Sequence, residues 1–135
     1  MVNQNKFQIL QKECSTCVKC SLSPTRNNVV FGRGNPHSKL FVIGEGPGQQ
    51  EDEQGLAFVG RAGKMLDNAF LSVGIDTNED CYISNIVKCR PPNNRKPLSN
   101  EIKKCMPWLN EQIELIKPKV IVLSLIHISE PTRRS

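Results

Sequence analysis

The stretch from Leu40 to Asp52 constrains the fold of this chain more than any other, because it joins a short apolar run to a glycine-rich break. Residues 40–43 have the length and residue types of a buried strand. The loop from Gly44 to Gly48 then contains glycines and a proline that neither a strand nor a helix would tolerate. A buried strand that ends in such a loop is where open α/β sheets bind ligands. The alternative is a plain turn with solvated acids.

Length and composition are those of one soluble globular domain. The chain has 135 residues, of which 38% are hydrophobic and 23% charged, a size that can bury one core but not two. No apolar run is long enough to cross a membrane and the polar N-terminus lacks a signal peptide, so we expect a cytoplasmic protein with no membrane partner. Six cysteines in a reducing compartment indicate metal ligands or buried thiols rather than disulfides.

Apolar runs of strand length alternate along the chain with stretches of helical period. We expect strands at 29–31, 40–43, 81–87 and 120–123, and helices at 1–13, 65–73 and 99–116. Pro107 should kink the last helix or delay its start. The strands are near-continuous apolar runs, as in a parallel sheet that is buried on both faces. The fold class is therefore α/β, with three layers and a central parallel sheet.

Two overlapping Cys-x-x-Cys units, formed by Cys14, Cys17 and Cys20, begin the cysteine pattern. Such a unit brings two sulfurs close enough to hold one metal ion. Cys89 and Cys105 follow much later, and four ligands drawn from both regions would tie the N-terminal loop to the last helix. The wide second spacing is atypical of zinc ribbons and is tolerated by an iron–sulfur cluster. Buried thiols without metal are the alternative.

A basic, proline-rich loop follows the expected strand at 81–87. It carries four basic residues and no acid within nine positions: Lys88, Arg90, Arg95 and Lys96. The net charge of +5 has the sign that contact with a nucleic-acid backbone requires. The alternative is a solvated basic loop.

Five motifs occur together and in order: Cys17-x-x-Cys-x-Leu22, Asn28-Val-Val-Phe-Gly32, Gly44-Glu-Gly-Pro-Gly-x-x-Glu-Asp52, Phe58-Val-Gly-Arg-Ala-Gly63 and Asn85-Ile-Val-Lys-Cys-Arg-Pro-Pro-x-Asn-Arg95. On these motifs the chain strongly resembles the family 4 uracil-DNA glycosylases from about residue 17 to residue 123. The resemblance implies a DNA-repair hydrolase that excises uracil from single- or double-stranded DNA and acts as a monomer.

The resemblance also implies a four-iron, four-sulfur (4Fe-4S) cluster held by four cysteines: Cys17, Cys20, Cys89 and Cys105. Cys14 is then an extra cysteine, and Cys81 is a core thiol on an expected strand. The cluster would be structural and would hold the basic loop against the sheet. The four basic residues of that loop would bind the DNA backbone without reading its sequence.

For recognition, the resemblance implies a pocket into which the target nucleotide is flipped. Phe58 would stack on the uracil; otherwise it is a core residue. The Asn85 side-chain amide would accept from uracil N3–H and donate to O4, a pattern that cytosine reverses; otherwise it caps the strand end. Main-chain groups of three loop glycines would contact uracil oxygens or a DNA phosphate: Gly44, Gly46 and Gly48.

For catalysis, a carboxylate near the sugar would stabilise positive charge there and orient a water molecule. Glu45 and Glu51 both qualify by their positions in the loop, and the sequence does not choose between them, although we rank Glu45 slightly ahead. His127 is not in a context that resembles the family's histidine motif, and it receives no role.

The resemblance stops before the later helix, strand and histidine loop of the family. We therefore expect residues 1–123 to form an incomplete glycosylase domain that is inactive as given. We expect residues 124–135 to be a non-native tail, because its last five residues match one reading frame of a common sequencing adapter. The main competing hypothesis is a non-catalytic DNA-binding module stapled by a metal. A nucleotide-phosphate binder is a weaker one, because the glycine loop fits the known phosphate motifs poorly.

Overall fold

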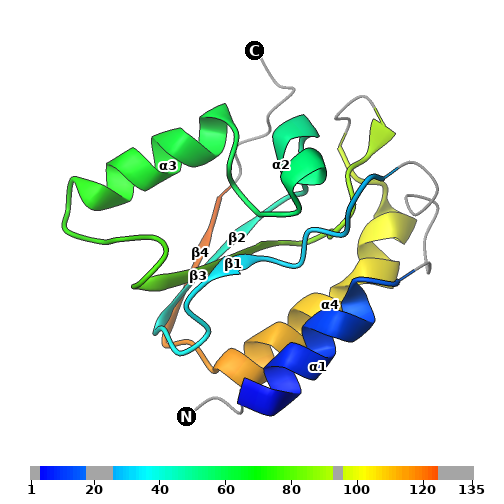
Figure 1. Ribbon diagram of the computed structural model, residues 1–135, viewed down its shortest axis with the longest axis horizontal. Helices are drawn as coiled ribbons and strands as arrows, with labels where there is room; N and C mark the ends of the chain where they lie inside the picture. Colours follow the sequence, from blue (N-terminus) through cyan, green and yellow to red (C-terminus); the bar gives the residue numbers. More distant parts are fainter. Residues whose placement is uncertain (1–3, 18–25, 93–95, 125–135) are drawn as a thin grey trace.

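The computed structural model describes residues 4–17, 26–92 and 96–124 of the chain. These residues form a four-stranded sheet with helices packed on both of its faces (Figure 1). Among the residues expected to be functional, Cys20 and Arg95 lie outside the described residues. The same holds for His127 and for all of the expected tail except Ser124.

The sheet has the spatial order β1-β3-β2-β4 and consists of β1 (Arg33–Gly34), β2 (Leu40–Gly44), β3 (Cys81–Asn85) and β4 (Val120–Leu123). β2 pairs in parallel with both β3 and β4, which confirms the expected parallel sheet for these three strands. β1 pairs with β3 in the antiparallel direction, so the sheet as a whole is mixed.

The strand expected at 29–31 is wrong, because pairing begins only at Arg33. Gly34 allows that pairing, since a Cβ at this position would collide with the carbonyl oxygen of Cys81 on β3. Val30 is nevertheless buried, and its N–H donates to the carbonyl of Lys88 at 2.7 Å. The segment is therefore packed against the chain beyond β3 without extending the sheet.

The helices form the two outer layers. α1 (Gln4–Cys14) and α4 (Ser99–Ile116) pack against each other on one face, and α3 (Arg61–Leu71) covers the other (Figure 1). Alternate strand residues serve the two sides: Phe41 and Tyr82 pack with α1 and α4, whereas Val42 and Ile83 pack towards α3. The three-layer α/β architecture is as expected.

The helices differ from the sequence-based expectation in two respects. α3 begins at Arg61, four residues before the expected start at 65, and one short helix is additional. α4 begins at Ser99 and runs through Pro107, so the proline does not delay its start. A short helix that was not expected, α2 (Gln49–Gln54), begins directly after the glycine-rich loop. Glu51 favours this start, because its side chain accepts a hydrogen bond from the N–H of Gly48 at 3.0 Å.

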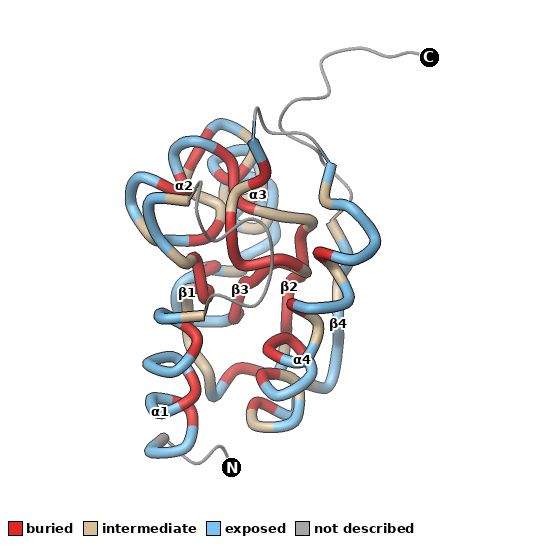
Figure 2. Tube along the Cα trace, turned by 90° about the vertical axis from the view of Figure 1, so that its right-hand side faces the viewer, coloured by how far each residue is buried: buried red, intermediate tan, exposed pale blue. Residues whose placement is uncertain are grey.

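Burial falls from the centre of the sheet to its edge. β3 is buried along its whole length, whereas β4 exposes its apolar side chains, with Leu123 65% exposed (Figure 2). Among the described residues β4 pairs only with β2. No helix in the described ranges is long and apolar enough to cross a bilayer.

Candidate functional site

The parallel strands β2 and β3 end side by side, and this brings the two halves of the candidate site together. Gly44, at the end of β2, is the register partner of Asn85, at the end of β3. The pairing continues beyond the strands, because Ile86 N–H donates to the Gly44 carbonyl at 2.8 Å and Val87 N–H to the Glu45 carbonyl at 3.1 Å. The start of the glycine-rich loop is thereby held beside Asn85, which is buried.

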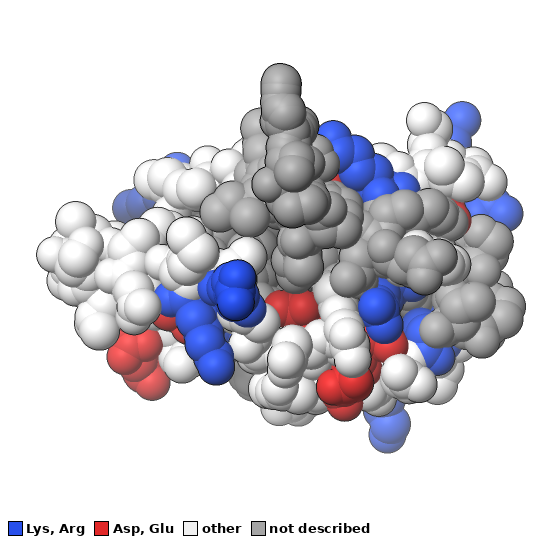
Figure 3. Space-filling view, turned by 90° about the horizontal axis from the view of Figure 1, so that it is seen from above, with Lys and Arg blue, Asp and Glu red and all other residues white. Residues whose placement is uncertain are grey.

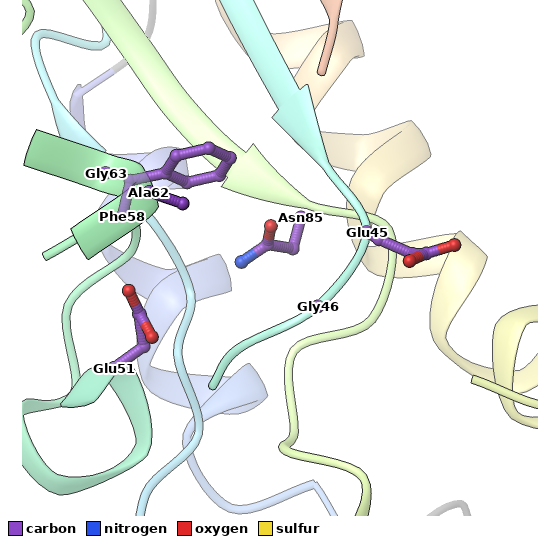
Figure 4. A pocket seen from close by; sticks show the side chains of 7 residues that line it. All are labelled: Glu45, Gly46, Glu51, Phe58, Ala62, Gly63 and Asn85. Atoms are coloured by element: carbon purple, nitrogen blue, oxygen red, sulfur yellow. The ribbon is translucent and has the colours of Figure 1, made fainter. Parts of the chain in front are cut away.

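Phe58 lies against this strand end in a backbone conformation that is uncommon for residues other than glycine. Its φ is 57°, in the left-handed region. A Cβ on Gly44 would come within 2.6 Å of the Phe58 ring atom Cε1 and within 2.5 Å of Asn85 Oδ1. A Cβ on Gly63 would come within 2.7 Å of the Phe58 Cα. The position of Phe58 beside Asn85 (Figure 4) therefore depends on glycine at both places.

These elements enclose a pocket lined by Glu45, Gly46, Glu51, Phe58, Ala62, Gly63 and Asn85 (Figure 4). The structure thus brings together both candidate carboxylate residues and the two side chains expected to recognise a base. Ala62 and Gly63 were not expected to line the pocket, and the clustered glycines at 55, 60 and 63 were the signal that could have found them. The pocket has about 20 Å³ open to the centres of water molecules, which suits ordered water.

Glu51 is buried and its carboxylate is occupied by main-chain donors. Oε1 accepts from Gly48 N–H at 3.0 Å, and Oε2 accepts from Val59 N–H at 3.0 Å and Gly60 N–H at 2.8 Å. Gly60 is the residue before the first turn of α3. One carboxylate therefore joins the N-terminal ends of α2 and α3, the usual place for an acid that satisfies helix N–H groups.

Glu45 has different surroundings. In Figure 4 its side chain extends away from Phe58 and Glu51, and its oxygen Oε1 is buried. The next residue, Gly46, packs against Val87, since a Cβ there would come within 2.8 Å of the Val87 side chain. The two candidate carboxylates therefore lie on opposite sides of the loop.

The three loop glycines also differ. Gly44 is part of β2 and leaves room for the Phe58 ring, and Gly46 lines the pocket. Gly48 N–H is already bonded to Glu51, and the Gly48 carbonyl accepts from Asp52 N–H at 2.9 Å. The Gly48 amide therefore caps α2 in this structure and does not have a free N–H for the expected contact with a ligand.

Three of the four expected metal ligands lie in the described residues, and each sulfur accepts a hydrogen bond. Trp108 Nε1 donates to Cys17 Sγ at 3.3 Å, Arg26 Nη1 to Cys89 Sγ at 3.3 Å, and the Lys88 main-chain N–H to Cys105 Sγ at 3.2 Å. Donors of this kind stabilise thiolates, and hydrogen bonds to the ligand sulfurs are typical of iron–sulfur sites. The donor set therefore fits a cysteine-ligated cluster.

The extra cysteine lies next to this set. The pKa of the Cys14 thiol is raised to about 12, chiefly by burial; Lys88 opposes this rise, and the nearby sulfurs of Cys105, Cys17 and Cys89 contribute to it. Among the described residues no three potential ligands converge closely enough to hold a metal ion. Cys81 is a buried core thiol on the α3 side of the sheet, as expected.

Lys88 does not belong with the other basic residues of its loop. It is 1% exposed, and its ammonium donates to Ser84 Oγ at 2.7 Å and to the Asn85 carbonyl at 2.6 Å. Burial lowers the pKa of this ammonium to about 8. The expected contact of Lys88 with a DNA backbone is therefore wrong, because a cation buried in this way cannot reach a phosphate. The sequence placed it correctly in a basic run but gave no sign of its burial.

Two other basic residues of the loop lie in the described part of the chain: Lys96 is exposed and Arg90 is partly exposed. Figure 3 views the end of the molecule that carries α2 and the carboxyl ends of the central strands. Basic side chains lie there on both sides of a hollow that has acidic atoms at its centre. Arg61 and Lys64 in the first turns of α3 are also exposed. This end of the molecule combines a recessed acid with a cationic rim.

Residues 31–124 match the family model of the uracil DNA glycosylase superfamily. A type-4 uracil-DNA glycosylase of Archaeoglobus fulgidus is 47% identical over 111 residues, which are 82% of this chain and 55% of that protein. One of Thermotoga maritima is 47% identical over 116 residues, or 86% of this chain and 60% of that protein.

A more distant relative is a type-5 uracil-DNA glycosylase of Pyrobaculum aerophilum, 30% identical over 103 residues, which are 66% of this chain and 45% of that protein. The chain spans between about half and three fifths of the length of the type-4 relatives it matches.

Proposed function

Because the chain belongs to the uracil DNA glycosylase superfamily, we propose that it carries the base-recognition site of a DNA-repair hydrolase. The reaction is hydrolysis of the N-glycosidic bond of uracil in DNA, which leaves an abasic site. The observation that supports this function best is the meeting of Phe58 and Asn85 in one pocket at the carboxyl ends of β2 and β3. Type-4 relatives with 43–47% identity add to this support.

Recognition begins with a nucleotide flipped out of the stack, because a base inside a duplex cannot be reached. Phe58 offers the face of its ring to the base, and stacking of this kind tolerates any base. Selectivity comes from Asn85, whose amide accepts from uracil N3–H and donates to O4. Cytosine presents the opposite donors and acceptors, so buried polar groups would be left unpaired in its complex.

Cleavage builds positive charge on the sugar and negative charge on the departing uracil. We assign Glu45 to the sugar side, where a carboxylate stabilises the positive charge and orients the attacking water. Glu51 is assigned a supporting role, because its oxygens already accept three main-chain hydrogen bonds. The proton balance is that of hydrolysis: water adds its hydroxyl to C1′ and the uracil anion takes the proton.

The cysteines are proposed to hold a 4Fe-4S cluster through Cys17, Cys20, Cys89 and Cys105. The donors already present at three of the sulfurs support thiolate ligands there. When bound, the cluster supplies a structural crosslink between the chain after α1, the loop after β3, and α4. Arg90, Arg95 and Lys96 follow Cys89 directly and would bind the phosphates of single- or double-stranded DNA.

The function is tested by excision of uracil from a labelled oligonucleotide, with abasic sites scored by alkaline cleavage. Since the relatives are longer than this chain, the assay uses both the chain and a chimera in which it replaces the matching segment of the Thermotoga maritima relative. Abasic sites at uracil and not at thymine are expected from the chimera. Binding of uracil DNA without any excision would favour the alternative, a metal-stapled DNA-binding module.

Selectivity is tested with Asn85→Asp in the same chimera. A carboxylate cannot donate to O4, so we expect the preference for uracil over cytosine to fall by at least about tenfold, the discrimination that one buried hydrogen-bonding group provides. The ratio of cleavage rates on matched uracil and cytosine oligonucleotides measures it. Unchanged selectivity would remove Asn85 from the recognition role.

A further inference from the structure

The conformation of Phe58 needs an explanation that its own sequence position does not give. Its left-handed φ of 57° costs free energy for a residue with a Cβ, and such a conformation persists only where the surroundings hold it. Gly44 and Gly63 make room for the residue but do not bind it. The groups that bind its main chain come from Arg33, on the short edge strand β1.

Arg33 binds the main chain on both sides of Phe58. Its Nε donates to the Ala57 carbonyl at 2.5 Å, and its Nη2 donates to the Phe58 carbonyl at 3.0 Å. Ala57 is fully buried, so its carbonyl has few other partners to choose from. The two bonds together fix the orientations of the two peptide planes that flank Phe58 and hence the direction in which its ring leaves the chain.

The guanidinium is itself fixed from the opposite side. Nη2 also pairs with Asp67 Oδ1 on α3 at 3.0 Å, while Nη1 donates to Asn78 Oδ1 at 2.8 Å and Thr77 Oγ1 at 3.3 Å. Thr77 Oγ1 donates in turn to Asp67 Oδ1 at 2.7 Å. All five guanidinium N–H directions are therefore used. The arginine side chain is only 10% exposed.

We propose that Arg33 is the positioning residue of the pocket: it holds Phe58 in the left-handed conformation that places the aromatic ring beside Asn85 for base stacking. The inference rests on the proposed recognition of a flipped base. It concerns a residue outside the pocket lining that acts on the base only through Phe58. The strand pairing of β1 with β3 sets the distance, because Arg33 is the register partner of Ile83 on the strand that ends at Asn85.

Lysine should not replace this arginine, although it keeps the charge. A guanidinium presents five donors in a rigid planar fork, whereas an ammonium presents three donors at one point. An ammonium at this place could bind Asp67 or one carbonyl, but it could not hold two carbonyls and reach Asn78. The Arg33→Lys variant therefore keeps the positive charge and removes only the planar arrangement of five donors.

The test uses the full 135-residue chain with ¹³C-labelled phenylalanine. Nuclear Overhauser contacts of the Phe58 ring with Gly44 and the Asn85 amide are compared in the parent chain, Arg33→Lys and the control Arg61→Lys, an exposed arginine on α3. We expect Arg33→Lys to lose these contacts and Arg61→Lys to keep them. Contacts at parental intensity in Arg33→Lys would overturn the proposal, whether or not the chain binds DNA.

If Arg33→Lys does not fold, as judged by circular dichroism, the pair Asp67→Asn and Asn78→Ala loosens the fork while leaving Arg33 in place. We expect weaker Phe58 contacts in each and the weakest in the double variant. Parental contacts in the double variant would contradict the proposal equally.

The functional consequence is measured as the affinity for a single-stranded oligonucleotide with one 2′-fluoro-2′-deoxyuridine, which resists cleavage. We expect Arg33→Lys to weaken binding roughly tenfold relative to the parent, in line with the loss of one stacking contact. The same change in a Phe58→Ala background should have almost no further effect on affinity, since Arg33 acts through Phe58. An equal loss of affinity in both backgrounds would show that Arg33 does not act through Phe58.

A parent chain that binds the uracil oligonucleotide no better than a thymidine oligonucleotide would instead count against the proposed function. The contacts of the Phe58 ring would still decide the role of Arg33.

Discussion

At the scale of single residues, two glutamates in one loop have opposite surroundings. Glu51 accepts three hydrogen bonds from the main chain, and Glu45 extends to the other side of the loop. A carboxylate that satisfies otherwise orphaned N–H groups contributes to stability, because each of them would be costly to leave buried and unpaired. The two residues should therefore respond differently to the same isosteric change.

Glu51→Gln should lower the free energy of unfolding by about 2 kcal/mol, because the amide NH₂ would face backbone N–H donors. Glu45→Gln should lower excision in the chimera, because a neutral amide cannot stabilise the positive charge on the sugar. Urea unfolding followed by circular dichroism, with exposed Glu53→Gln as control, measures the first effect. A Glu51→Gln variant as stable as the parent chain would contradict the capping role of Glu51.

A second residue-scale property is the pH dependence that Cys81 confers. Burial raises the pKa of this β3 thiol to about 11, with Asp80 adding to the shift and Arg33 opposing it. In the unfolded chain the thiol loses its proton near pH 9, whereas the folded chain keeps it to about pH 11. The unfolded state therefore binds fewer protons in this window, and stability falls as pH rises through it.

The contribution of Cys81 over this window is at most about 2 kcal/mol, since a pKa difference of one unit corresponds to about 1.4 kcal/mol and solvent screening reduces it. Cys81→Ala should remove that part of the decline between pH 9 and pH 11. The measurement is the difference in unfolding free energy between parent and variant at each pH. Parallel curves for the two proteins would show that Cys81 does not contribute.

At the scale of elements, the first turn of α3 requires a glycine because it packs against the main chain of Phe58. Gly63 is buried there and contacts the main chain of Phe58. Glycine inside a helix costs about 1 kcal/mol relative to alanine, so packing must outweigh propensity for it to be favourable. The contact is with backbone, which cannot move aside as the end of a flexible side chain could.

Gly63→Ala should accordingly destabilise the chain by at least about 1 kcal/mol, since overpacking costs about 1 to 3 kcal/mol and usually exceeds the gain in helix propensity. Asn68→Ala, at an exposed position of the same helix, should be neutral or slightly stabilising. Thermal unfolding of both variants checks the difference. A stabilised Gly63→Ala would mean that the Phe58 backbone can shift without cost.

At the scale of the whole molecule, polar contacts join the layers at the cysteine site. Ser84 Oγ on β3 donates to the Phe31 carbonyl at 2.8 Å, and Gln112 Nε2 on α4 donates to the same carbonyl at 2.8 Å. The Lys88 ammonium reaches Ser84 from the loop that carries Cys89. The cysteine site and the end of β3 are therefore parts of one buried hydrogen-bond network. Loss of a cysteine ligand should therefore lower the stability of the whole network.

Cys105→Ser should abolish the visible absorbance of the anaerobically reconstituted protein and lower its thermal midpoint by several degrees, because a group bound only by the folded chain stabilises it. Cys14→Ala should retain the absorbance, since Cys14 is not among the proposed ligands. Iron and sulfide analysis accompanies the spectra. A colourless parent protein that contains zinc would contradict the proposed cluster and indicate a zinc site.

Much of this molecule follows from local pattern. The apolar runs predicted β2, β3 and β4, and the helical periods predicted α1, α3 and α4. The resemblance to the family 4 glycosylases assigned Phe58, Asn85 and the two loop glutamates to one site, and the structure gathers them around one pocket. Side-chain periodicity depends only on near neighbours, so it can be read directly from the amino-acid order.

Tertiary structure alone decided what the polar groups of these residues do. Lys88 belongs to a basic run in sequence, yet its ammonium is buried against Ser84 and Asn85. Arg33 gave no signal at all, yet its partners at Ala57, Phe58 and Asp67 lie 24 to 34 positions away. Hydrogen-bond partners of buried groups are set by which distant segments the fold brings within about 3 Å. Glu51 and Arg33 are bound to main-chain groups of the Ala57–Gly60 stretch for this reason, and no local spacing encodes it.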